Sequence, residues 1–95
     1  MTVKLIRMWS GEDVIADLSE EKNDSIVINN PIVAIPQQGQ IGFAPWSPLI
    51  SQKVKELEVI KRYVVYISEP QEDIVDQYNQ MFSTIATPTK KLILS

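Results

Sequence analysis

Short segments of alternating apolar and polar residues cover the first two thirds of the chain, as expected for strands that pack one face. Residues 3–9 and 13–18 both alternate, and residues 10–11, a serine and a glycine, are typical of the tight turn of a hairpin. A third apolar segment, residues 26–35, is interrupted by the Asn-Asn-Pro of residues 29–31. Proline cannot donate a ladder hydrogen bond, so we expect a bulge or a bend there.

Two further strands complete the β-rich part of the chain. Residues 40–51 predict a bent or edge strand, because Pro45 and Pro48 would interrupt a regular ladder. Residues 57–67 predict the last strand, and their apolar end, residues 63–67, indicates burial on both faces or pairing on both edges. Short strands separated by turn residues at this spacing are typical of a small barrel.

Residues 69–86 predict an amphipathic helix after the last strand. Its first half is rich in carboxylates, which favour the positive end of the helix dipole. An apolar stripe recurs at helical spacing and should pack on the barrel or on a neighbouring subunit: Ile74, Tyr78, Met81, Phe82 and Ile85. The helix should end before Pro88, and residues 87–95 form a tail that we expect to be either an edge strand or disordered.

Length and composition favour a small binding domain. A chain of 95 residues favours one domain, made of a barrel (1–68), the helix (69–86) and the tail (87–95). The chain has neither cysteine nor histidine, which excludes disulfides, thiolate or imidazole metal sites, and Cys–His or Ser–His–Asp nucleophile systems. We therefore expect no catalysis and no cofactor. No apolar run approaches a membrane span, and the start of the chain has no signal-peptide pattern, so we expect a cytoplasmic protein.

Charge narrows the candidate sites. The net charge of −3 argues against bulk non-specific binding of nucleic acid and leaves room for a local basic patch. Lys61, Arg62 and Tyr63 are the strongest candidate, because two cations and an aromatic ring can hold a phosphate and stack on a base. A solvated loop above a packed Tyr63 is the alternative. Three acidic pairs are better explained as solvated surface: residues 12–13, 20–21 and 72–73.

The order of these segments resembles the Sm-like fold, the family of the eukaryotic Sm and LSm proteins and the bacterial host-factor rings. Residues 3–30 resemble the first family motif of strand, glycine turn, strand, polar loop and strand, with Ala16 where the family carries a small residue. Residues 60–68 resemble the second motif, a hydrophobic and a basic residue before a closing apolar strand. The chain departs from the family in its shorter polar loop at residues 23–25, in Arg62 in place of a glycine, and in a helix that follows the strands.

The resemblance implies an all-β fold, a small SH3-like five-stranded barrel of Sm type with a C-terminal α-helix. It also implies a homo-oligomeric ring of about five to seven subunits. Loops of the two motifs line the RNA-binding pore in such rings, so the residues implied to bind RNA, or single-stranded DNA, are Asn23, Asp24, Lys61, Arg62 and Tyr63. The closing strand lacks the charges and prolines that protect a free edge, and should pair with a neighbouring subunit through Val64, Val65, Tyr66 and Ile67.

Other interpretations stay open. An OB-fold is the alternative fold, and a turn alone also explains Asn23 and Asp24. The whole chain also resembles short proteins of tailed phages of marine cyanobacteria, in residues 42–48 and 69–82. These phage proteins have no established activity, and the alternative function is a protein–protein adaptor or structural module of phage origin, in the host cytoplasm. Trp46 should lie in the core or in a subunit contact rather than form an exposed stacking platform.

The same alternation predicts which side chains form the core of the barrel. They are the apolar residues that we assign to the inner face of each strand: Leu5, Val14, Leu18, Val27, Ile35 and Val65.

Overall fold

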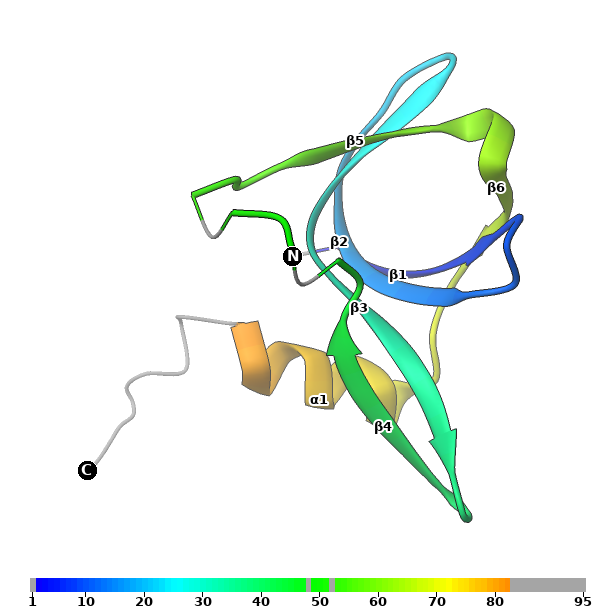
Figure 1. Cartoon of the computed structure of the whole chain (residues 1–95), viewed down its shortest axis with the longest axis vertical. Helices are drawn as coiled ribbons and strands as arrows, with labels where there is room; N and C mark the ends of the chain where they lie inside the picture. Colours follow the sequence, from blue (N-terminus) through cyan, green and yellow to red (C-terminus); the bar gives the residue numbers. More distant parts are fainter. Residues whose placement is uncertain (1, 48, 52, 83–95) are drawn as a thin grey trace.

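The computed structural model describes residues 2–47, 49–51 and 53–82 of the chain. Its strands form one antiparallel sheet in the order β4-β3-β2-β1-β6, and β5 pairs with a second part of β3 (Figure 1). The described chain is mostly β with one helix, as predicted. The elements in order are β1 (Val3–Met8), β2 (Asp13–Glu21), β3 (Ser25–Gln37), β4 (Gln40–Pro45), β5 (Leu57–Ile60), the 3₁₀ turn η1 (Lys61–Tyr63), β6 (Val64–Ser68) and α1 (Glu72–Phe82).

The long strand β3 has two different partners on one of its edges. Residues 25–28 pair with β5, and residues 32–37 pair with β4, while β2 runs along the opposite edge. The change of partner follows Asn30, which has a positive φ of 49° and lies where the register between β2 and β3 shifts. The bulge predicted at residues 29–31 is thereby confirmed.

The sheet is strongly curved. Figure 1 shows β1, β2, β3, β5 and β6 arranged around a common interior, whereas the β3–β4 hairpin extends away from them. The structure has six strands where we expected five, because η1 divides the predicted last strand into β5 and β6. No ladder joins β5 to β6 in the described part of the chain, so the sheet is open between them.

Two apolar clusters lie on opposite faces of this sheet, because successive residues of a strand point to opposite sides. The first fills the concave interior and consists of Ile6, Met8, Val14, Ala16, Ile26 and Ile28. The second lies between the sheet and α1 and consists of Val3, Ile15, Ile32 and Tyr78. β2 thus contributes to both clusters, which explains why Val14, Ile15 and Ala16 are apolar without interruption.

Three of the six predicted core residues are wrong. Val14 and Val27 are buried as expected, and Leu18 packs on the first cluster. Leu5 is partly buried against the second cluster instead, because Ile6 and Met8 are the residues of β1 that face the interior. Ile35 is 40% exposed, because the pairing of β3 with β2 ends at Val33 and the chain continues into the projecting hairpin. Val65 is 52% exposed, because a register shift between β1 and β6 leaves it opposite no residue and turns its side chain outward.

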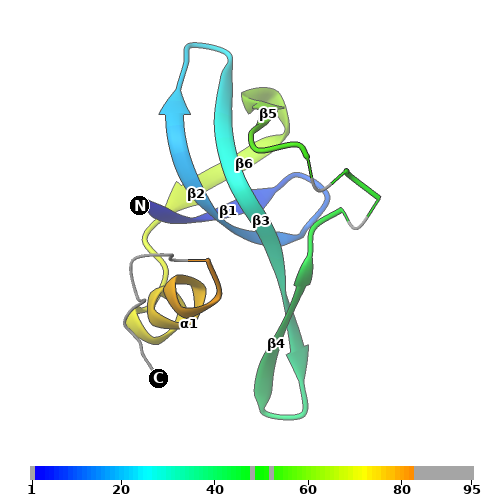
Figure 2. The same cartoon turned by 90° about the vertical axis from the view of Figure 1, so that its left-hand side faces the viewer.

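The helix α1 packs on its own sheet through most of the predicted stripe. Ile74 and Phe82 contact the second cluster, and Tyr78 is only 1% exposed. Met81 departs from the prediction, since its side chain is 48% exposed. The helix begins at Glu72 instead of residue 69, and the predicted last turn and the tail lie outside the described residues. Figure 2 views α1 close to end-on, beside β1 and β2.

The Tyr78 hydroxyl ties the helix to two strands. It accepts a hydrogen bond from the backbone N–H of Asp17, with 3.0 Å between nitrogen and oxygen. Its single O–H hydrogen is shared between the neighbouring backbone carbonyls of Asn29 and Asn30, whose oxygens lie 2.9 and 3.0 Å from the hydroxyl oxygen. These carbonyls belong to the bulge of β3, so the Tyr78 hydroxyl connects α1 to both β2 and β3. Burial raises the pKa of Tyr78 to about 12.

Because of this raised pKa, we expect the protein to lose stability between pH 10 and pH 12. Below pH 10 the phenol of Tyr78 is neutral in both the folded and the unfolded protein. Above pH 10 the phenol ionises in the unfolded protein first, which favours unfolding. The loss of stability stops growing near pH 12, where the phenol also ionises in the folded protein. The full difference corresponds to roughly 3 kcal/mol. Urea unfolding measured across this range should show the loss in the parent protein and a much smaller one in Tyr78→Phe. Tyr66→Phe, which removes a half-exposed phenol, should behave like the parent, and an equal loss in all three proteins would contradict the assignment.

Candidate nucleic-acid interface

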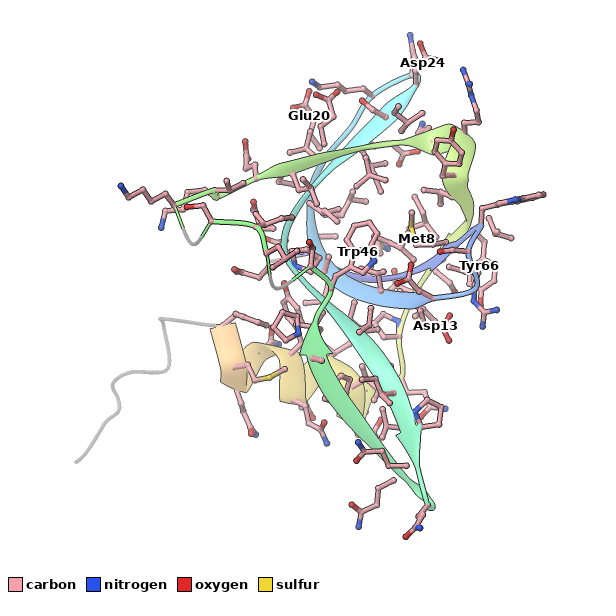
Figure 3. All side chains as sticks on the ribbon, in the orientation of Figure 1. Met8, Asp13, Glu20, Asp24, Trp46 and Tyr66 are labelled. Atoms are coloured by element: carbon pink, nitrogen blue, oxygen red, sulfur yellow. The ribbon has the colours of Figure 1, made fainter. Side chains whose placement is uncertain are left out.

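The turn between β2 and β3 lies against η1. The backbone N–H of Lys61 donates to the carbonyl of Asp24 at 2.9 Å, and Ser25 is paired with Ile60 in the adjoining ladder. The exposed residues Asn23 and Asp24 therefore lie beside Lys61, although almost forty positions separate them in sequence. Figure 3 places Asp24 at the extreme end of the molecule, at the tip of the β2–β3 hairpin.

The 3₁₀ turn η1 presents its own side chains to solvent. It is a single turn closed by a bond from the Val64 N–H to the Lys61 carbonyl, and none of its residues is buried. Arg62 is exposed and Tyr63 is 51% exposed. The predicted site residues Asn23, Asp24, Lys61, Arg62 and Tyr63 thus come from two neighbouring segments, and we call them the turn–η1 surface.

Trp9 is an exposed aromatic residue that sequence reasoning did not place in this site. Its backbone N–H donates to the carbonyl of Tyr63 at 2.7 Å, and its side chain is 76% exposed. The bond holds the β1–β2 turn against η1. Its position in the sequence could have indicated this exposure, because Trp9 comes directly before the predicted Ser10-Gly11 turn. The neighbouring strands cover a side chain poorly where a strand ends in a turn.

Ion pairs reduce the positive charge of the turn–η1 surface. Lys61 Nζ lies 3.0 Å from Glu21 Oε2, and Lys22 Nζ lies 3.4 Å from Glu58 Oε2. The Ser25 hydroxyl also donates to Glu58 at 2.6 Å, and this bond, together with the charge of Lys22, lowers the pKa of the Glu58 carboxyl. Among the described residues, Arg62 makes no ion pair, so it carries most of the uncompensated positive charge here.

The predicted assembly strand, β6, lies at an edge of the sheet. It pairs with β1 on one side, and the described residues provide no partner on the other. Val64 and Ile67 pack against the first cluster, whereas Val65 and Tyr66 are exposed. Tyr66 lies opposite Arg7, whose guanidinium makes a two-point ion pair with Asp13 at 2.5 and 3.1 Å. The strand therefore offers a free backbone edge and two exposed apolar side chains.

Trp46 packs against the first cluster, as expected of a core residue. Figure 3 shows its ring directed into the interior of the curved sheet, on the same side as Met8. It is therefore not a stacking platform for a base, and the exposed aromatic residues of this end of the molecule are Trp9, Tyr63 and Tyr66.

We also searched residues 2–47, 49–51 and 53–82 for a metal site and for a membrane-spanning helix. No three acidic side chains come close enough together there to hold a metal ion. No helix in this part is both long and apolar enough to cross a membrane. Comparison with known proteins adds no further candidate: no protein-family model matches the chain, and no curated protein is significantly similar to it.

Proposed function

We propose that this protein binds single-stranded nucleic acid, RNA or single-stranded DNA, through the turn–η1 surface and catalyses no reaction. The observation that carries the proposal is the bond from the Lys61 N–H to the Asp24 carbonyl, which joins the two segments that hold all five candidate residues. An exposed guanidinium beside a half-exposed phenol ring suits a phosphate and a stacked base.

The proposed architecture is an SH3-like barrel of Sm type. It is supported by the path of the chain from β5 through η1 to β6. β5 pairs with β3 and β6 pairs with β1, so one 3₁₀ turn carries the chain from one edge of the curved sheet to the other. In this scheme β1, β2, β3, β5 and β6 are the barrel strands, and β4 belongs to a hairpin added to it.

A ring of about five to seven subunits is the proposed assembly, formed when the free edge of β6 pairs with a neighbouring copy. The exposed side chains of Val65 and Tyr66 support it, because they would be covered by such a contact. A ring also places one Arg62 from each copy around a common opening, where low-dielectric walls focus the field. Light scattering at micromolar concentration should give a multiple of the 10.8 kDa chain, and a monomer would remove the ring from the proposal.

The binding surface is tested by fluorescence anisotropy with short RNA and DNA homopolymers at several salt concentrations. We expect Lys61→Ala/Arg62→Ala to weaken binding and to reduce the slope of log affinity against log salt by about 1 per cation removed. The matched control is Lys53→Ala/Lys55→Ala, which removes the same charge from exposed positions outside the turn–η1 surface and should bind like the parent. If both double variants lose affinity equally, only net charge matters and the proposed surface is wrong.

A gain of affinity provides a sharper test. Glu21→Gln should strengthen binding severalfold, because it releases Lys61 from its 3.0 Å ion pair and removes a carboxylate that repels phosphate. Glu72→Gln makes the same change in net charge at the start of α1 and should leave the affinity close to that of the parent. Unchanged binding in Glu21→Gln would show that Lys61 does not face the nucleic acid.

The second candidate function is a protein–protein adaptor or structural module. The ion pairs of Lys61 and Lys22 favour it, since they leave the turn–η1 surface with little free positive charge. If the parent protein binds neither RNA nor single-stranded DNA at low salt, this function becomes the proposal.

A further inference from the structure

The β3–β4 hairpin is an arm that projects from the rest of the sheet, and both views show it (Figures 1 and 2). Its turn consists of Gln38 and Gly39, which have positive φ values of 33° and 83°. Two consecutive residues with positive φ make the turn type that matches the right-handed twist of paired strands. The arm is therefore a regular two-stranded ribbon with a defined register.

The arm and its base carry no charge. The sequence has no charged side chain between Asp24 and Lys53. Ile35 and Ile41 lie exposed near the tip of the arm, at 40% and 52%. Leu49, just past the end of β4, is 94% exposed. Ile35 pairs with Gly42 and Ile41 with Pro36, so the two isoleucine side chains point to opposite faces of the arm and leave each face with an exposed apolar residue.

The free edge of β4 has a defined set of hydrogen-bonding groups. Gln37 and Gln40 flank a two-residue turn, so they form a hydrogen-bonded pair, and pairs alternate along an antiparallel ladder. Ile35 and Gly42 are then the next hydrogen-bonded pair. The backbone N–H and C=O groups of Ile41 and Phe43 consequently point away from β3. β4 pairs only with β3 among the described strands, so these four groups lie along an edge that those strands leave open.

We propose that β4 pairs antiparallel with β4 of a second copy of this chain, about a two-fold axis at Gly42. In this register Ile41 of one copy exchanges two hydrogen bonds with Phe43 of the other, and the symmetry repeats the exchange. Gly42 lies opposite Gly42 of the second copy as a non-hydrogen-bonded pair, with about 4.5 Å between Cα atoms. All four free groups of each copy are satisfied.

A second copy fits this edge for two reasons. The free groups lie symmetrically about Gly42, so the edge is complementary to itself, as a two-fold interface requires. Two copies that each carry a net charge of −3 also meet here without like-charge contact, because the arm is uncharged. Antiparallel pairing further brings the tip of one arm, with Ile41, toward the base of the other, where Leu49 is exposed.

The contact is tested by the effect of a proline on the molecular mass. Ile41→Pro removes only an N–H that points away from β3, and proline is tolerated on an edge strand in that orientation, so the chain should still fold. Light scattering should give a mass for Ile41→Pro that is half the mass of the parent, whether or not β6 forms a ring. Ile41→Val keeps the N–H and should keep the parent mass. Equal masses for the parent and a folded Ile41→Pro would overturn the proposal.

A second measurement reads the register directly. In a mixture of isotope-labelled and unlabelled protein, we expect a nuclear Overhauser effect between the Gly42 Hα atoms of the two copies. A parent protein without this contact would overturn the β4 pairing, even if its mass is that of an oligomer. The outcome is separable from nucleic-acid binding, since Ile41→Pro leaves the turn–η1 surface intact and should retain the RNA affinity of the parent.

Discussion

Tyr78→Ala should lower the free energy of unfolding by about 3 to 5 kcal/mol, the range for truncating a large buried aromatic side chain. The ring is almost fully buried among Val3, Ile15 and Ile32, and its centroid lies 4.7 Å from that of Phe82. The substitution also removes the hydrogen bonds of its hydroxyl to the part-buried backbone groups of Asp17 and Asn29, which adds to the cost. Urea unfolding followed by circular dichroism measures the loss.

Tyr78→Phe and Met81→Ala are the controls for this prediction. Tyr78→Phe keeps the ring and should cost only about 1 to 3 kcal/mol, the penalty for unsatisfied buried polar groups. Met81 lies on the same helix with its side chain half exposed, so Met81→Ala should change stability much less. A loss below about 1 kcal/mol in Tyr78→Ala would mean that α1 does not hold the sheet as the structure shows.

Ile6→Ala should lower the free energy of unfolding by about 2 to 5 kcal/mol. Ile6 is 1% exposed and lies at the centre of the first cluster, opposite Val14 on β2 and Ile67 on β6. Its neighbours come from three strands of a curved sheet, which limits how far they can move to fill the cavity. The same urea titration provides the measurement.

Val65→Ala is the matched control for Ile6→Ala. Its side chain points outward from the bulge of β6, so the loss should stay within about 0.5 kcal/mol at concentrations where β6 has no partner. A large loss in Val65→Ala together with a small loss in Ile6→Ala would mean that the β1–β6 pair buries its other face, and it would contradict the structure.

Local patterns predicted the elements well. Alternation located β1, β2 and β3, and the three-to-four-residue spacing located α1. The strand predicted over residues 40–51 was too long, because β4 ends at Pro45. These features depend on side-chain direction and backbone chemistry within a few residues, which a sequence displays directly. The positions of Ile35 and Val65 were wrong because exposure depends on where a ladder ends or shifts its register, and that is a property of two strands.

In the candidate interface, too, the sequence showed what is adjacent along the chain and did not show the contacts between distant segments. Lys61, Arg62 and Tyr63 were visible as a cluster of two cations and an aromatic ring, because they are adjacent in sequence. The ion pair of Lys61 with Glu21 was not visible, since it joins residues from β2 and η1 that pairing alone brings together. The place of Trp9 beside this surface was not visible either, since it depends on the hydrogen bond from the Trp9 backbone N–H to the carbonyl of the distant Tyr63.

The sequence by itself determined the class of the fold, short strands followed by a helix, and the lack of cysteine and histidine side chains. Only the tertiary structure decided that β3 serves two partners, that α1 covers its own sheet through Tyr78, and that Lys61 is neutralised while Arg62 stays free of ion pairs in the described chain. The physical reason is that strand and helix periods are local, whereas burial and charge pairing are set by residues far apart in the chain.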